Sequence, residues 1–193
     1  MKPLTRNDLL SLEAYAAERS DFRARVIAHK KPRKVHLGEH LTLIFEDRLT
    51  IQYQIQEMLR VERIFEAAGI EDELGAYNPL IPDGGNLKAT MLIEYSDPEV
   101  RKRELAKLRN VEHDIALQVG ELPPVKAIAD EDLERSNEDK TSAVHFMRFE
   151  LDDAMRAAWK DGAPVFLSCT HDHYPVRVQL DANQHAALGA DLD

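Results

Sequence analysis

The longest helical pattern of apolar and polar positions runs from Arg48 to Ala68, a stretch without glycine or proline. At about 100° per residue, the apolar positions form two sectors that cover most of the circumference. The larger sector contains Ile51, Ile55, Met58, Leu59, Val61 and Phe65, and the smaller one contains Leu49, Tyr53, Ile64 and Ala67. A helix that is apolar on two sides is normally covered on both, so the pattern predicts a long central helix.

Two carboxylates, Glu57 and Glu62, fall inside these apolar sectors. A buried carboxylate requires a cation, several hydrogen-bond donors, a metal ion or a proton. Arginine and backbone donors would make both groups structural, whereas a ligand or metal pocket would make them functional. About 140° separates the two on the helix, so we do not expect them to serve one site. Glu57, with Arg60 three residues further on, is the stronger candidate.

The same periodicities, together with capping and turn residues, predict the remaining elements. Expected helices run from Thr5 or Asn7 to 18, from Ser20 or Asp21 to 30, over 98–110 and 152–160, and from 181 onward. Expected strands cover 35–45, 87–95, 114–120, 125–128, 141–151, 165–170 and 176–180. The charged stretch 130–140 is expected to be a solvated helix and loop.

One strand carries apolar groups on both faces, with His145, Met147 and Phe149 on one side and Val144, Phe146 and Arg148 on the other. This pattern places the strand in the middle of a sheet. The expected fold is α+β, with a mixed, mainly antiparallel sheet packed against the long central helix and flanking helices. We expect a single domain over 1–193, comprising N-terminal helices (1–31), an α+β core (35–180) and a C-terminal helix (181–193).

Composition narrows the classes of function. The 193 residues are 44% hydrophobic and carry a net charge of −10, which argues against general nucleic-acid binding. The single cysteine excludes an internal disulfide framework, and no apolar run approaches the roughly 18 residues that span a bilayer. We therefore expect a cytoplasmic protein without a membrane partner, and a homo-oligomer remains possible.

The sharpest metal motif is Cys169-x-His171-x-His173. In an extended chain these side chains share one face about 6.6 Å apart, which suits one transition-metal ion such as iron, zinc or manganese. The same residues lie where a hairpin between two predicted strands must turn, and a turn breaks the alternation. The motif is therefore compatible with two interpretations, a metal site or a structural turn.

Further polar residues are candidates for a ligand pocket. Arg148 and Arg60 could supply cations to the carboxylates of the helix, and Asn78 and Tyr174 could line the pocket. Glu94 follows a predicted strand and is a further candidate. Phosphate-binding, dinucleotide-binding and nucleophile motifs are absent from the sequence.

Five segments carry a family resemblance, namely 43–50, 54–62, 77–82, 89–94 and 144–149. They resemble the bacterial domain-of-unknown-function family 3501, and the similarity extends to His171 and Tyr174. The family has no established activity. The resemblance implies genes that lie beside those of rubrerythrin-like and iron-sulfur oxidoreductase proteins, and hence iron or peroxide metabolism. The late family motif has one histidine before the turn, which weakens a three-ligand site that includes His173.

These observations leave three functional hypotheses. The first is a non-haem metal or small-ligand binding protein that serves an oxidative-stress or redox system, with His171 as a ligand or proton carrier. The second is a non-catalytic accessory protein that docks on a rubrerythrin-like or iron-sulfur oxidoreductase partner, or on itself. The third is an enzyme that uses Glu57 as a general base, which requires a raised pKa.

Overall fold

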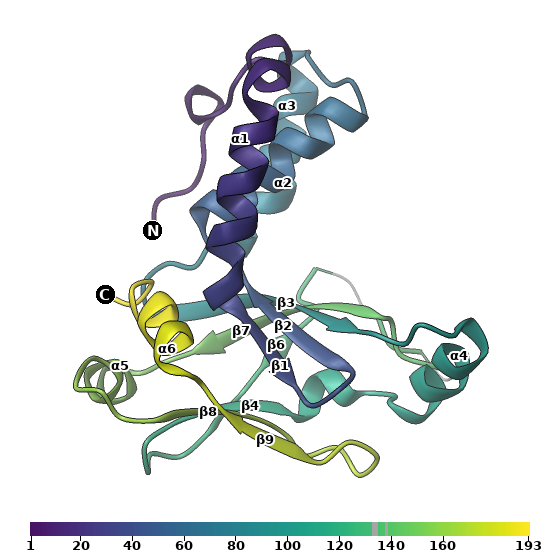
Figure 1. Ribbon diagram of the computed structural model, residues 1–193, viewed down its shortest axis with the longest axis vertical. Helices are drawn as coiled ribbons and strands as arrows, with labels where there is room; N and C mark the ends of the chain where they lie inside the picture. Colours follow the sequence, from purple (N-terminus) through teal and green to yellow (C-terminus); the bar gives the residue numbers. More distant parts are fainter. Residues whose placement is uncertain (133–134, 138) are drawn as a thin grey trace.

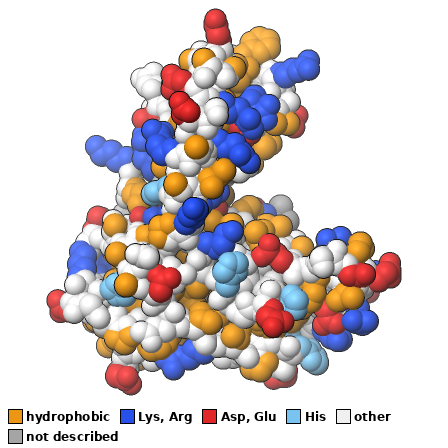
Figure 2. All heavy atoms as spheres, viewed as in Figure 1, with side chains coloured by type: hydrophobic (Ala, Val, Ile, Leu, Met, Phe, Trp, Pro, Cys, Tyr) orange, Lys and Arg blue, Asp and Glu red, His pale blue; other side chains and the backbone are white. Residues whose placement is uncertain are grey.

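Three helices project from two antiparallel sheets in the computed structural model, which describes residues 1–132, 135–137 and 139–193 (Figure 1). The three are α1 (Leu12–Lys30), α2 (Arg48–Val61) and α3 (Ala67–Tyr77). Their apolar side chains form two clusters of their own, separate from the core of the sheets. We call this part the helical lobe. Acidic and basic side chains are intermingled over the face of the molecule shown in Figure 2.

The first sheet has the strand order β1-β2-β3-β7-β6, and the second has the order β5-β4-β8-β9. Their bounds are β1 Lys34–Leu37, β2 Leu41–Phe45, β3 Asn86–Ile93, β4 Ile115–Val119, β5 Val125–Lys126, β6 Ile128–Ala129, β7 Val144–Glu150, β8 Val165–Cys169 and β9 Val176–Gln179. One apolar cluster draws on both sheets, so they share a core. The helices α4 (Pro98–Lys107) and α5 (Asp153–Lys160) lie at opposite ends of the sheets, and α6 (Ala182–Gly189) follows β9 (Figure 1).

The α+β class and the interior position of β7, between β3 and β6, are confirmed. Instead of one mixed sheet there are two, and every strand pair among the described residues is antiparallel. The two predicted N-terminal helices are one continuous α1, because Ser20 and Asp21 lie within the helix and cap nothing. Part of the predicted helix and loop at 130–140 lies outside the described residues.

The prediction of a long central helix was wrong in length and in place. Helix α2 ends at Val61, where Arg63 takes a left-handed conformation (φ 56°) and the amide of Ile64 donates to the carbonyl of Leu59. Glycine usually occupies this capping position, and because arginine stands there, the sequence contains no local signal for the end of the helix. Val61 and Phe65 are 59% and 71% exposed, and α2 packs against α1 and α3 instead of the sheets.

The helical lobe is joined to the sheets at Arg33, which is buried in the short 3₁₀ helix η2 (Lys31–Arg33). Its guanidinium donates to the carbonyl oxygens of Phe45 (3.1 Å) and Glu46 (3.3 Å), just before α2, and to that of Ala187 in α6 (3.3 Å). It also forms an ion pair with Asp191 near the C-terminus. One side chain thus binds the start of α2, the end of β2 and the C-terminal helix.

Asp47 links the same junction to α1. Its carboxylate caps α2 by accepting from the amide of Thr50 (2.9 Å), and it lies 2.5 Å from Nε2 of His29 and 3.4 Å from the Arg33 guanidinium. Burial acts to raise the pKa of Asp47, but Arg33, the Thr50 amide and His29 outweigh it and lower the pKa. Asp47 therefore stays ionised at the foot of the helical lobe.

Tyr174 holds the turn between β1 and β2. Its hydroxyl donates to the carbonyl oxygen of Leu37 (3.0 Å) and accepts from the amide of His40 (2.8 Å). Gly38 lies in this turn with φ 76°, and a Cβ there would lie 2.6 Å from the Tyr174 hydroxyl oxygen. The predicted single strand 35–45 is therefore a hairpin, and the hydroxyl of Tyr174, a predicted pocket residue, bonds the backbone of its turn.

In the part of the chain that the structure describes, no helix is both long and apolar enough to cross a lipid bilayer.

Tyr174→Phe should lower the free energy of unfolding by about 1–3 kcal/mol, because it leaves a partly buried carbonyl and amide without their shared partner. Urea denaturation measures the change. Tyr95→Phe is the matched control, because no hydrogen bond of the Tyr95 hydroxyl is found among the described residues. Equal stability of the two variants would contradict the assigned role of Tyr174.

Candidate functional site

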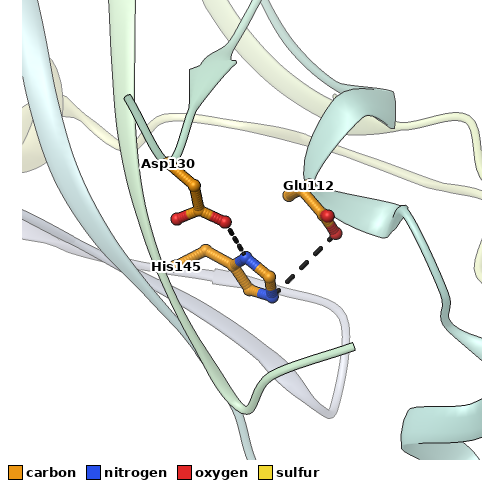
Figure 3. A group of neighbouring side chains, drawn as sticks. All are labelled: Glu112, Asp130 and His145. Atoms are coloured by element: carbon orange, nitrogen blue, oxygen red, sulfur yellow. Dashed lines mark hydrogen bonds and ion pairs between the residues drawn. The ribbon is translucent and has the colours of Figure 1, made fainter. Parts of the chain in front are cut away.

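A buried cluster of metal-ligating side chains lies on the core side of the first sheet (Figure 3). It consists of Glu112 in the 3₁₀ helix η4 (Val111–Asp114), Asp130 directly after β6, and His145 on β7. One potential ligand atom from each residue lies within 4.8 Å of the others. Among the described residues this is the one such group of three or more.

His145 is the centre of the cluster and is fully buried. Its Nδ1 lies 2.6 Å from Oδ2 of Asp130, and its Nε2 lies 3.9 Å from Oε2 of Glu112 (Figure 3). Nε2 also lies 2.8 Å from the Thr141 hydroxyl and 3.0 Å from the carbonyl oxygen of Ser142. The Asp130 carboxylate and the Ser142 carbonyl only accept, so in this arrangement both ring nitrogens donate.

Asp130 is held in place from two directions. Its backbone amide donates to the carbonyl of Phe146 (2.8 Å), and its Oδ1 accepts from the amide of Phe146 (3.0 Å) and from Arg135 (3.2 Å). Its φ of 52° lies in the left-handed region, which asparagine and aspartate enter more readily than most residues. The carboxylate therefore faces Nδ1 of His145 in a fixed orientation.

Glu112 completes the cluster with a side chain that is 3% exposed. Its carboxylate accepts from the hydroxyls of Ser136 (2.5 Å) and Thr141 (3.3 Å). A cavity of about 230 Å³ borders Glu112, Asp130 and Ser136. Every buried side-chain nitrogen and oxygen of the described residues has a hydrogen-bond partner, so an ion that enters must replace existing bonds at Nε2 and Glu112.

The sequence contained one signal for this site. The alternation that defines β7 placed His145 on the same face as Met147 and Phe149, and a histidine on an apolar face needs polar partners. Those partners come from η4 and from the end of β6, at separations of 33 and 15 residues. No local motif joins them, so their identity could not be read from the sequence.

Glu57, the leading sequence candidate, forms a structural ion pair. Arg19 donates to both of its oxygens (2.7 and 2.9 Å), the Tyr15 hydroxyl donates to one of them (2.7 Å), and Arg60 donates at 3.2 Å. The Arg19 hydrogen bonds lower the pKa of Glu57 to about 2, against the opposing effect of burial. A general base with a raised pKa is therefore contradicted, and Glu62, at the end of α2, is exposed.

Three other candidates lie apart from the cluster. The Asn78 side chain bonds the backbone amide and carbonyl of Leu4 (2.8 and 2.9 Å) and fixes the N-terminal segment. Glu94 is exposed and accepts from the Thr42 hydroxyl (2.6 Å). Arg148 pairs with acidic residues of its own sheet region, Glu131 and Glu150, instead of the α2 carboxylates.

The Cys169, His171 and His173 side chains do not form a ligand group in the structure. Cys169 is buried on β8, whereas the chain turns after it. The turn directs Nε2 of His171 to the carbonyl of Arg109 (3.1 Å), and its Nδ1 accepts from the amide of His173 (3.2 Å). Of the two interpretations open for this motif, the structure contains the hairpin turn.

The chain is similar to proteins of unknown function over nearly its whole length. The model of a family described as protein of unknown function (DUF3501) matches residues 3–192. A crystal structure of a protein of unknown function from Burkholderia pseudomallei K96243 is 55% identical in sequence, with a TM-score of 0.95 and full coverage of both chains. A search of the curated proteins gives no significant match.

Glu57→Gln should lower the free energy of unfolding by about 2 kcal/mol at neutral pH. The reason is that the lowered pKa of Glu57 means that its ionised form stabilises the folded state. That contribution is complete above the ordinary pKa of 4.5 and is lost as the pH falls towards about 2. Urea denaturation at neutral and acidic pH should therefore show the difference from wild type narrowing in this range. Glu18→Gln, at an exposed position of α1, should change stability little at any pH.

Cys169 should be almost inert in the folded protein, because burial raises the pKa of its thiol to about 11. We expect alkylation by iodoacetamide to be about a hundredfold slower in the native protein than in denaturing urea. A Cys169→Ser, Thr170→Cys protein places a thiol on the exposed neighbouring residue and is the matched control. Comparable rates for the two native proteins would contradict the burial of Cys169.

Proposed function

The chain belongs to the DUF3501 family of proteins of unknown function, and from its own site we propose that it binds a divalent transition-metal ion. Nε2 of His145 and the Glu112 carboxylate are the proposed ligands. The observation that carries the proposal is the convergence of three ligand-type side chains within 4.8 Å, in a nearly closed site beside a cavity. The metal-binding hypothesis from the sequence is thus kept, at a different set of residues.

The ligand types narrow the choice of ion. One imidazole and one or two carboxylates suit iron(II), manganese(II) or zinc, and a thiolate that would favour softer metals is absent from the cluster. Asp130 on Nδ1 forms the carboxylate–imidazole pair that orients a metal-bound histidine and increases its basicity. Asp130 is accordingly proposed as an orienting residue, with Glu112 on the side of Nε2.

Metal binding requires a modest rearrangement of the site. The Nε2 proton is lost to solvent, and Nε2 gives up its contacts with Thr141 and Ser142. The 3.9 Å between Nε2 and Glu112 Oε2 is slightly longer than the separation of about 3.0–3.4 Å between two ligand atoms on one small ion. The adjacent cavity of about 230 Å³ can supply water as further ligands.

The biological setting is proposed from the family resemblance alone. Gene neighbours of the rubrerythrin-like and iron-sulfur oxidoreductase type favour a role beside a redox partner. The competing proposal is an accessory protein in which Glu112, Asp130 and His145 form a purely structural charge cluster. Its support is the complete hydrogen bonding of the buried polar atoms in the described residues.

Protein purified without a histidine tag should contain about one equivalent of iron, manganese or zinc, or should take up Co²⁺ after removal of metal with a chelator. Elemental analysis and the visible absorption of bound Co²⁺ measure occupancy. His145→Gln and Glu112→Gln should abolish uptake, and Asp130→Asn should weaken it about 10–100-fold.

The His171→Ala, His173→Ala double variant is the matched control and should bind metal as wild type does. Circular dichroism and the melting temperature show whether each variant remains folded. Protein that contains no metal and takes up no Co²⁺ would overturn the proposal, as would uptake that survives in folded His145→Gln. Co-purification of metal-free protein with an oxidoreductase would favour the accessory role.

A further inference from the structure

A cleft of about 480 Å³ lies between the end of the helical lobe and the outer face of the first sheet. Residues of α3, of the following 3₁₀ helix η3 (Asn78–Leu80), of β3 and of β7 line it. Its volume lies within the range of about 300–1,000 Å³ that is usual for small-molecule sites. The residues used below are Tyr77, Leu80, Lys88, Phe146 and Arg148.

The walls of the cleft are largely apolar and aromatic. Tyr77 and Leu80 line it from the helical side, and Phe146 lines it from β7. In the strand register Lys88 pairs with Arg148, and Phe146 pairs with Thr90, so the cations lie one step along the sheet from the Phe146 ring. Flat apolar molecules fit between such walls because ring contacts add to the area they bury.

Most charges at the cleft are already matched. Glu131 accepts from Arg148 (2.7 and 2.8 Å), and Arg148 also pairs with Glu150. Asp132 accepts from Arg135 (2.5 and 2.7 Å). The two carboxylates at the cleft are thus paired with arginines and are not available to bind a cationic ligand.

Lys88 is the exception. Its ammonium donates to the carbonyl oxygen of Pro79 (2.6 Å), and no carboxylate of the described residues forms an ion pair with it. Two of its three N–H groups are therefore available. Burial is the largest cause of its lowered pKa, and Arg148 adds to the lowering, whereas the nearby carboxylates of Asp83, Glu131 and Glu150 act in the opposite direction. A half-buried ammonium with no carboxylate in direct contact among the described residues, beside apolar walls, can donate to an anion.

We propose that this cleft binds a small aromatic acid. The carboxylate or phosphate of the ligand accepts from Lys88, and its ring packs between Tyr77 and Phe146. A neutral analogue would leave Lys88 without a direct ion pair, and an aromatic amine would be repelled by it. This site is separate from the metal cluster, because Phe146 and His145 face opposite sides of β7.

Titration of the full chain with benzoate, phenyl phosphate, benzamide and benzylamine, followed by ¹H–¹⁵N spectra, tests the proposal. The two anions should shift amide signals at 75–80, 88–89 and 146–148 and should bind more tightly than neutral benzamide, whereas benzylamine should not bind. Lys88→Met should weaken benzoate binding about tenfold, which corresponds to the loss of one charged hydrogen bond. Lys88→Arg should retain it.

Lys126→Met removes an exposed lysine of the second sheet and is the matched control, with binding expected to be unchanged. Phe146→Leu keeps an apolar wall without the ring and should reduce the preference for benzoate over cyclohexanecarboxylate. If Lys88→Met does not fold, Lys88→Gln replaces it. Equal binding of benzoate and benzamide, equal binding by folded Lys88 variants, or no shifts up to the solubility limit would overturn the proposal, as would identical shifts with inorganic phosphate.

Discussion

The burial of one guanidinium, that of Arg33, is the interaction on which the arrangement of this protein depends. It is 2% exposed and lies where the helical lobe, the first sheet and the C-terminal segment meet. It is shared between Asp47 and Asp191, and burial raises the pKa of Asp191 in spite of Arg33. Breaking a buried pair of this kind typically costs about 3–5 kcal/mol, because a charge is left without a partner. The orientation of the lobe, and with it one wall of the cleft, follows from this contact.

The segment after β6 connects the two proposed sites. Asp130 holds His145 on the core side of β7, while the next residue, Glu131, holds Arg148 on the outer side. Arg135 bonds both Asp130 and Asp132, and its guanidinium lies 4.6 Å from the centre of the Phe146 ring. One acidic stretch therefore pairs with Arg148 beside the cleft and orients the histidine of the metal cluster. Charges of this segment, which are expected from the sequence to be solvated, instead pair with His145, Arg148 and one another.

The parts of the fold that depend on local periodicity could be predicted from the sequence. Strand alternation located β3, β7 and β8, and capping residues located the starts of α4, α5 and α6, where aspartates are the observed N-caps. The end of α2 could not be predicted, because Arg63 occupies a position that normally signals itself with glycine. The hairpin of β1 and β2 depends on Tyr174, more than 130 residues further on.

For the candidate site, the sequence could predict that buried charged residues need partners, but not which residues those partners are. A carboxylate on an apolar helix face does need a partner, and for Glu57 that partner is Arg19, which belongs to another helix. Helix periodicity states the need for a counter-charge but does not say which distant residue meets it. The same holds for His145, whose carboxylates come from segments without a shared motif.

The alternation of β7 has a consequence for how the protein can change over evolution. His145 and Phe146 are neighbours in the chain, yet one belongs to the buried charge cluster and the other to the open cleft. Insertion or deletion of a single residue in this strand would exchange their faces and disrupt both places at once. Substitutions can alter each place separately, whereas the length of the strand is a constraint common to both.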